Sequence, residues 1–508
     1  MIATTKSEAE QFYLLYKDKN FLEIFELDEV IRKIGILIDS YKINNDINVI
    51  EKGISTIKEL EKKEKEFYNK NYSILCYFLG NAYSEKYYYY IKKDVNNLIY
   101  LNYLAHKVYY YRAALEKNDF DNYKKCQVLC NLGNALSSMG RLMEGLKYCD
   151  EAIKIDSTFG MAYFIKAEHL LNNTRFLYDN SHTNLFVKQA YKNYKKAIKV
   201  GKLEDKEYYN QIKEKILYIE SCFPLEFLNE KKDFIDVSYF GKEKEYRKWG
   251  IENNLFLNPL NSLYDDLAVA EDILHLPDMI APIEERIPYF YVMFNNIKHE
   301  FISIRYMYFE YITNKNEKSI SDNDVLLYDS GQDELFSFQV EKLKLVFRMA
   351  YSLFDKIAYF INFYYKLNIP LEKINFKNIW SQENKDRLLK GNNWILHSLY
   401  WINLELYDKN HKGILLNKEA KKINSLRNFC EHRIVQVTKF PIKINIKPKD
   451  AYFNISLEEF EEKTDSILHL VRNTIIYLSL SINVEERKKK TENTFPMFLK
   501  IYDLDENI

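Results

Sequence analysis

Eight residues in the C-terminal part of the chain combine a helical pattern with a chemical one: Leu426-Arg427-Asn428-Phe429-Cys430-Glu431-His432-Arg433. Leu426 and Cys430 belong to a row of apolar residues at steps of three and four, which is typical of one face of an α-helix. The row consists of Ile423, Leu426, Cys430, Ile434 and Val437. It predicts a helix over about residues 416–437.

Three more segments near this run have helical periodicity. Residues 335–368 have one apolar face and end before Pro370, and Asn393 opens a helix that continues to Leu406. Ser456 and Glu459 have the spacing of a capping box, which predicts a fourth helix to about residue 484. Four helices with apolar seams predict a four-helix bundle over residues 335–485.

Between the third and fourth helices, residues 439–449 alternate Ile with Lys or Asn around two prolines. This alternation predicts an extended basic excursion or a short hairpin. It could contact a phosphate backbone or form a solvated edge.

The N-terminal half predicts an array of helical hairpins. Its clearest unit is residues 125–158, with a second helix in which small and large residues alternate. The unit contains Leu129, Leu132, Gly133, Leu136, Gly145, Cys149 and Ala152. The run Cys76-x-x-Leu79-Gly80-x-x-Tyr83 repeats its first half, with a Leu-Gly pair that lets two helices approach closely. A third, degenerate unit contains Tyr163, Ala167, Leu170, Ala190, Tyr194 and Ala197.

These spacings are similar to those of tetratricopeptide (TPR) repeats. That resemblance implies a continuous array whose concave face binds a protein or peptide. The alternative is a structural spacer or a platform for dimerisation. We therefore expect N-terminal helices at 1–70, a TPR-like array at 71–220, a connecting segment at 221–334, the bundle at 335–485 and a tail at 486–508.

The connecting segment contains the run Leu255-Phe256-Leu257-Asn258-Pro259-Leu260-Asn261. Its apolar residues predict a packing contact that fixes the repeat array to the bundle. Asn258 and Asn261 are expected to serve as cap and turn residues, because Asn side chains hydrogen-bond nearby backbone groups.

Composition limits the function classes. Lys plus Arg and Asp plus Glu both number 73 in 508 residues, so no global positive field attracts nucleic acid, and RNA contacts would need a local basic patch. The 13 Gly and 9 Pro residues are few, which favours an all-α fold. The six cysteines form no C-x-x-C pair, no signal-peptide pattern opens the chain, and no apolar run approaches ~18 residues. We expect a reduced, cytoplasmic protein without a membrane span.

Arg427 and His432 carry the candidate chemistry. A fixed cation beside a group that takes and gives protons suffices for cleaving a phosphodiester without a metal. The two positions differ by about 140° around a helix, so one helix presents them poorly to a single phosphate. Two such helices across a two-fold axis could close one pocket. A second pair, Arg175 and His182, lies in a stretch rich in Asn, Ser and Thr, which predicts a loop without this role.

The Arg-x4-His pair, the LFLNPLN run and the helices around them resemble a HEPN domain, in a subgroup with N-terminal repeats. The resemblance implies a dimeric endoribonuclease that needs no cofactor or metal and leaves a 2′,3′-cyclic phosphate and a 5′-hydroxyl. It gives His432 the proton transfer, Arg427 the phosphate, and Asn428 the orientation of either. Glu431 would hold the His432 tautomer or pair with Arg433. Toxin-like or antiviral defence through tRNA or mRNA cleavage, controlled by the repeat half, is the implied role.

Two alternatives stay open at this stage. Arg427, Glu431 and Arg433 could form a surface cluster of ion pairs beside an inert His432. The whole chain could then be a non-catalytic adaptor in which both halves bind proteins. A metal hydrolase has little support, because the histidines are scattered and no ligand set is recognisable.

Overall fold

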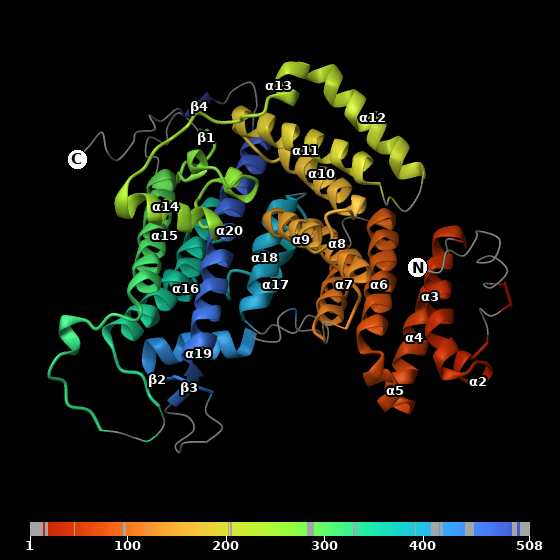
Figure 1. Ribbon diagram of the computed structural model, residues 1–508, viewed down its shortest axis with the longest axis horizontal. Helices are drawn as coiled ribbons and strands as arrows, with labels where there is room; N and C mark the ends of the chain where they lie inside the picture. Colours follow the sequence, from red (N-terminus) through yellow and green to blue (C-terminus); the bar gives the residue numbers. More distant parts are fainter. Residues whose placement is uncertain are drawn as a thin grey trace. The chain divides into compact units, whose positions relative to one another are not determined.

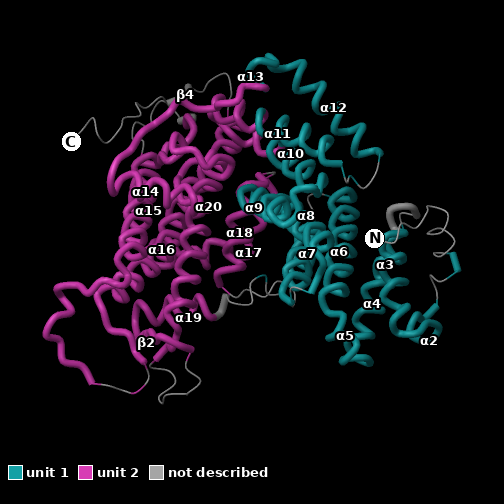
Figure 2. Tube along the Cα trace, in the orientation of Figure 1, with its two compact units in different colours: residues 1–171, 188–228, 409–416 teal, residues 172–187, 229–408, 417–508 magenta. Residues whose placement is uncertain are grey.

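The computed structural model is almost entirely helical, as the all-α prediction requires (Figure 1). It describes residues 14–15, 19–44, 46–94, 98–117, 119–201, 203, 206–281, 289–328, 331, 333–391, 393–407, 416, 420–441, 452–489 and 495–497. These residues form two compact units that interleave along the chain (Figure 2). Unit 1 is residues 1–171, 188–228 and 409–416, and unit 2 is residues 172–187, 229–408 and 417–508.

Unit 1 is built from successive helices, of which only residues 172–187, at the end of one helix and the start of the next, and the last residue of the final helix belong to unit 2. They are α2 (Phe21–Ile24), α3 (Leu27–Asn44), α4 (Ile47–Lys63), α5 (Lys65–Lys70), α6 (Tyr72–Lys93), α7 (Tyr100–Leu115), α8 (Asn122–Ser138), α9 (Leu142–Ile155), α10 (Gly160–Thr174), α11 (Asn180–Val200), α12 (Lys206–Cys222) and α13 (Leu225–Asn229). Asp121 caps α8 by accepting a hydrogen bond from the Lys124 amide, and Gly140 ends it with a positive φ of 77°. The helix pairs α6/α7 and α8/α9 pack closely, which confirms the helices predicted around residues 76–83 and 125–158.

Two glycines permit this close packing. A β-carbon on Gly80 would lie 2.4 Å from a ring carbon of Tyr111 in α7, and one on Gly133 would lie 2.9 Å from the Gly145 carbonyl oxygen in α9. Both distances are shorter than van der Waals contact. Larger residues would therefore separate the paired helices, so the Leu-Gly pattern has the steric role that the sequence predicts.

Unit 2 contains the longest helices of the chain. Its helical elements are α14 (Gly241–Glu252), η1 (Pro259–Ser262), η2 (Leu267–Val269), α15 (Tyr289–Asn314), η3 (Ile320–Asp322), α16 (Phe338–Tyr364), η4 (Leu371–Lys373), α17 (Gln382–Leu389), α18 (Trp394–Leu406), α19 (Ala420–His432) and α20 (Leu457–Lys488). Its strands are β1 (Met279–Ala281), β2 (Ile434–Thr438), β3 (Tyr452–Ser456) and β4 (Phe495–Met497). β1 pairs antiparallel with β4, and β2 pairs parallel with β3.

Helix α20 is the core of unit 2 and packs against α15, α16 and α18. By length and apolar composition it could cross a membrane, but most of it is buried among these helices, as expected for the core helix of a bundle. Ser456 caps α20 by accepting from the Glu459 amide, and Asn393 caps α18 by accepting from the Leu396 amide. Both helix starts agree with the sequence-based prediction. Helix α15, which the sequence placed in the connecting segment, also packs on α16.

The helix predicted over about 416–437 was too long. α19 ends at His432, and Ile434 and Val437 lie in strand β2 instead. The residues Ile434-Val435-Gln436-Val437-Thr438 are mostly β-branched, and such residues favour a strand when a partner is available. Residues 452–456 supply that partner in register. The basic excursion predicted at 439–449 lies largely outside the described residues.

The LFLNPLN segment is held by its own asparagines. Asn258 caps η1 by accepting from the Leu260 amide at 3.0 Å and donates to the Val269 carbonyl at 3.2 Å. Asn261 accepts from the Phe256 amide at 3.1 Å and donates to the Ile251 carbonyl at 3.2 Å. Both side chains are buried, so the cap and turn roles expected from the sequence are confirmed.

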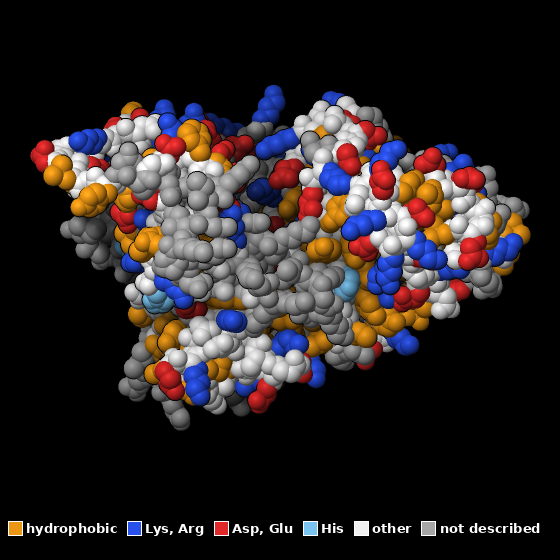
Figure 3. All heavy atoms as spheres, turned by 90° about the horizontal axis from the view of Figure 1, so that it is seen from below, with side chains coloured by type: hydrophobic (Ala, Val, Ile, Leu, Met, Phe, Trp, Pro, Cys, Tyr) orange, Lys and Arg blue, Asp and Glu red, His pale blue; other side chains and the backbone are white. Residues whose placement is uncertain are grey.

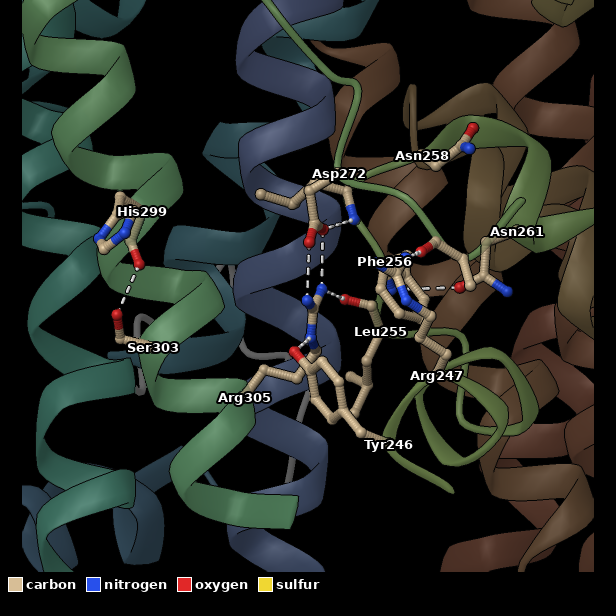
Figure 4. A network of polar contacts seen from close by, with 12 residues as sticks. Tyr246, Arg247, Leu255, Phe256, Asn258, Asn261, Asp272, His299, Ser303 and Arg305 are labelled. Atoms are coloured by element: carbon tan, nitrogen blue, oxygen red, sulfur yellow. Dashed lines mark hydrogen bonds and ion pairs between the residues drawn. The ribbon is translucent and has the colours of Figure 1, made fainter. Parts of the chain in front are cut away.

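Two buried arginines from different helices bind the backbone of the same segment. Arg305 of α15 donates to the Leu255 carbonyl at 3.0 Å (Figure 4). It also donates to both carboxylate oxygens of Asp272, at 2.7 Å in each case. Arg472 of α20 donates to the carbonyls of Phe256 and Asn258 at 2.9 and 3.0 Å. The segment is therefore anchored to the long helices of unit 2 by charged hydrogen bonds as well as by apolar contacts.

Candidate active site

Arg427 points from α19 toward the middle of α16. One of its terminal nitrogens lies 3.8 Å from a carboxylate oxygen of Asp355, and the guanidinium carbon lies 5.8 Å from the centre of the Tyr351 ring. The other terminal nitrogen donates to the Asn428 side-chain oxygen at 3.0 Å. The guanidinium is thus held by a carboxylate, an aromatic face and an amide, yet its side chain remains 29% exposed. It can therefore still bind an external phosphate.

Asp355 of α16 is partly buried, with 27% of its side chain exposed. Its burial raises the pKa of the carboxyl above the usual range, while the Phe376 amide, which donates to it at 2.9 Å, and the Arg427 guanidinium oppose that rise. A buried carboxylate needs such donors to keep its charge. Asp355 and Arg427 therefore stabilise one another and fix the direction of the guanidinium.

His432 stands at the last position of α19 and is exposed. Among the residues that the structure describes, no side-chain hydrogen bond or ion pair occupies its imidazole, and it does not contact Arg427. The imidazole is therefore accessible to a ligand. Among the described residues, no hydrogen bond joins the arginine to the histidine, and the two side chains have no common partner.

The remaining predicted residues take different partners. A carboxylate oxygen of Glu431 lies 3.8 Å from Arg348 Nε of α16, and no contact joins Glu431 to His432 in the described part of the chain. The tautomer role suggested for Glu431 therefore has no support in a single chain. The Arg433 guanidinium lies 5.0 Å from the centre of the Phe429 ring. Asn428 is exposed and its side-chain oxygen accepts from Arg427, so it is placed to orient that guanidinium.

Three residues of α16 complete the site and were missed by sequence reasoning: Arg348, Tyr351 and Asp355. Their spacing of three and four residues puts them on one face of the helix. The signal was present, because these polar groups interrupt the apolar run FRMAYSLFDKIAYF at helical spacing. Nothing in the spacing alone indicated that this face meets α19.

Other candidate groups have structural roles. His182, the partner in the second Arg–His pair, lies in the first turn of α11, where burial lowers its pKa despite the nearby Asp179. Cys430 in α19 is half-buried, and desolvation raises the pKa of its thiol to about 12, so it is not a nucleophile at neutral pH. Within the described ranges, no three His, Cys, Asp or Glu residues lie close enough together to hold a metal ion.

The charge on one face of the molecule is mixed. Figure 3 shows one face of the molecule, on which Lys and Arg side chains of the described residues are interspersed with Asp and Glu side chains. The described residues on this face therefore do not form a field of one sign.

One comparison with known proteins matches the region that contains these residues. Residues 282–485 match the family model described as LA2681-like HEPN. No curated protein and no solved structure matches the chain. The match spans α15 to α20, and so includes both the helix that carries Arg427 and His432 and the helix that carries Asp355. The C-terminal region of this chain is therefore a HEPN domain, similar to those of the LA2681-like group.

Proposed function

We propose that the chain is a metal-independent endoribonuclease whose site is completed by a second copy of itself. The observation that carries the proposal is the contrast between two residues of one motif. Arg427 is oriented by Asp355, Tyr351 and Asn428, while His432 is exposed and has no hydrogen-bond or ion-pair partner among the described residues. HEPN domains commonly act on RNA, which makes RNA the expected substrate class.

The reaction uses the RNA's own 2′-hydroxyl as nucleophile. One imidazole takes the proton of the 2′-hydroxyl as its oxygen attacks the adjacent phosphorus. The Arg427 guanidinium binds the phosphate and stabilises the charge that accumulates on its oxygens. The bond to the 5′-oxygen breaks, and a protonated imidazole gives that oxygen its proton. The products are a 2′,3′-cyclic phosphate and a 5′-hydroxyl, and DNA is spared because it lacks the nucleophile.

A two-fold dimer solves the geometric problem of a single chain. Proton removal and proton delivery need a base and an acid, and among the described residues of this motif the one histidine is His432. In a symmetric pair, His432 and the partner subunit's His432 could take the two roles. Two guanidiniums would then flank the same phosphate.

The proposal assigns control to the N-terminal half, as a TPR-like sensor of a protein or peptide. An unregulated ribonuclease poisons its host, so a toxin-like or antiviral defence role fits a nuclease joined to a sensor. Deleting residues 1–220 should change the toxicity of the expressed chain, and unchanged growth would count against this control.

The test is cleavage of total RNA by the purified full chain in the presence of a chelator. Arg427→Ala and His432→Ala should each abolish cleavage, and Asp355→Asn should slow it, because the guanidinium loses its carboxylate. His299→Ala is the matched control, since His299 is exposed on α15 and its ring makes no contact in the described part of the chain. It should cleave like the wild type.

The competing function, a non-catalytic adaptor, gives the opposite result. It predicts no cleavage by the wild type beyond that of the Arg427→Ala and His432→Ala variants. Equal loss in the His299→Ala control would indicate damage to the fold rather than to the site.

A further inference from the structure

Unit 1 contains a large groove of about 790 Å³. Its walls come mainly from α3, α6, α8 and α10, with Tyr208 of α12 at one end. The groove is far from closed and its lining mixes aromatic rings with amides and carboxylates. Such a space suits an elongated polar ligand with a few apolar anchors better than a compact apolar one.

Two asparagines on neighbouring helices place a free donor beside a free acceptor in this groove. The Tyr111 hydroxyl donates to Asn81 Oδ1 at 2.9 Å, and Asn131 Nδ2 donates to the same oxygen at 3.4 Å. Asn81 Nδ2 and Asn131 Oδ1 therefore have no partner among the described residues. One donor next to one acceptor is the complement of the C=O and N–H groups of a single residue in an extended peptide.

The groove also has an excess of negative charge. The charged residues of its lining are Asp28, Arg32, Asp39, Glu85, Lys124 and Glu168, so its formal charge is negative by two. Lys124 is already engaged, because its ammonium donates to Gln127 at 2.9 Å and lies 4.7 Å from the centre of the Tyr77 ring. The Glu168 carboxylate accepts from the Tyr194 hydroxyl and has no cation among the described residues.

Glu168 lies near the asparagine pair. The His169 ring, next to it in sequence, bonds the Asn134 side chain at 2.8 Å, and Asn134 is one helical turn from Asn131. A ligand held by Asn81 and Asn131 thus shares the groove with a carboxylate that has no cation among the described residues. The negative lining disfavours a phosphate backbone, so the groove fits a peptide rather than RNA.

We propose that this groove binds an extended peptide segment that carries a lysine or arginine. One residue of the peptide pairs its C=O with Asn81 Nδ2 and its N–H with Asn131 Oδ1. Its basic side chain reaches Glu168, and apolar side chains occupy the aromatic part of the groove beside Tyr77 and Phe164. The inference deepens the sensor role in the proposed function by giving its input a chemistry, but peptide binding does not depend on ribonuclease activity.

The experiment uses the full chain and a library of ten-residue peptides. Half of the library has a fixed Lys or Arg at the central position and half has Glu there, with the other positions random. The proposal predicts that the immobilised protein enriches the basic half. Fluorescence anisotropy then gives the Kd of the strongest peptide, and RNA cleavage is measured separately on the same preparation.

Variants identify the groove as the place of binding. Asn131→Ala and Glu168→Gln should each weaken the Kd about tenfold, the effect of one lost hydrogen bond or charge pair of about 1.4 kcal/mol. Asn122→Ala on the same helix and Glu214→Gln on α12 are matched controls, because both residues are exposed and do not line the groove. Their Kd should stay within about twofold of the wild type.

A change in the ligand gives a second, independent test. Methylating the backbone nitrogen that pairs with Asn131 should weaken binding to the wild-type protein as much as Asn131→Ala does, with no change to the protein. The proposal is overturned if no peptide is enriched, if the acidic half binds equally well, or if the groove variants bind like the controls. It is also overturned if a twelve-nucleotide single-stranded RNA displaces the peptide from the groove. Absence of RNA cleavage would overturn the proposed function and leave this inference standing.

Discussion

The buried ion pair between Arg305 and Asp272 allows a quantitative prediction about the anchor of the LFLNPLN segment. The Arg305 side chain is 1% exposed and that of Asp272 is 14% exposed. Burial by itself would raise the pKa of Asp272, but the Arg305 guanidinium and the Leu257 amide, which donates at 2.7 Å, lower it below the usual range. The ionised pair is therefore the stable form at neutral pH.

Asp272→Ala leaves the Arg305 guanidinium buried without a counter-ion. Loss of one partner of a buried pair costs about 3–5 kcal/mol, and the orphaned Leu257 amide adds about 1 kcal/mol. Since Asp272 is not fully buried, water can partly replace it, and we expect a loss of about 4 kcal/mol in the free energy of unfolding. The double variant Arg305→Met/Asp272→Leu should lose about 3 kcal/mol less than the two single variants together, because it leaves no unpaired charge.

Urea titration followed by tryptophan fluorescence measures these changes. All four tryptophans, at 249, 380, 394 and 401, belong to unit 2, so the signal reports the unfolding of that unit. Glu252→Ala removes a solvent-exposed pair with Lys248 on α14 and should leave the midpoint unchanged. A loss below about 1 kcal/mol for Asp272→Ala, or simple additivity in the double variant, would refute the reasoning.

Three further predictions concern single side chains. Burial lowers the pKa of His397 from 6.5 to about 4, so the unfolded chain binds the extra proton between these values. The free energy of unfolding should therefore fall by about 2 kcal/mol between pH 7 and pH 5. His397→Gln should flatten this dependence in urea titrations at these two pH values. Iodoacetamide at pH 8 should modify the exposed Cys222 rapidly, whereas Cys430, whose thiol pKa is raised, should react only after unfolding. Mass spectrometry of the labelled chain measures both reactions, and fast labelling of Cys430 would contradict this prediction. Gly133→Ala should lower the free energy of unfolding of unit 1 by about 1–3 kcal/mol, because the added β-carbon meets the Gly145 carbonyl. The helical circular dichroism signal should then be lost at a lower urea concentration, while the midpoint of the tryptophan fluorescence transition stays unchanged.

Local patterns in the sequence were sufficient for much of the fold. The caps at Ser456 and Asn393 and the steric role of Gly133 depend on neighbouring residues, and all are present in the structure. The end of α19 was mispredicted, because Ile434 and Val437 continue a helical row while their β-branched side chains favour the strand that β3 completes.

The surroundings of Arg427 could not be predicted in the same way. Its contacts with Asp355 and Tyr351 depend on the register between α16 and α19, which are about 70 residues apart in sequence. Periodicity shows which residues share a face of one helix, but it does not show which face of another helix they meet. The roles of Arg427, Asn428 and His432 in catalysis stay predictions.

The most direct measurement is the structure of the assembled protein under the conditions in which RNA cleavage is tested. The account predicts that two copies of α19 face one another across a two-fold axis. Arg427 and His432 would then line one pocket with the partner subunit's Arg427 and the partner subunit's His432, sized for a single phosphodiester. An assembly that holds the two histidines on opposite faces, or covers them with unrelated contacts, would contradict the proposed ribonuclease site.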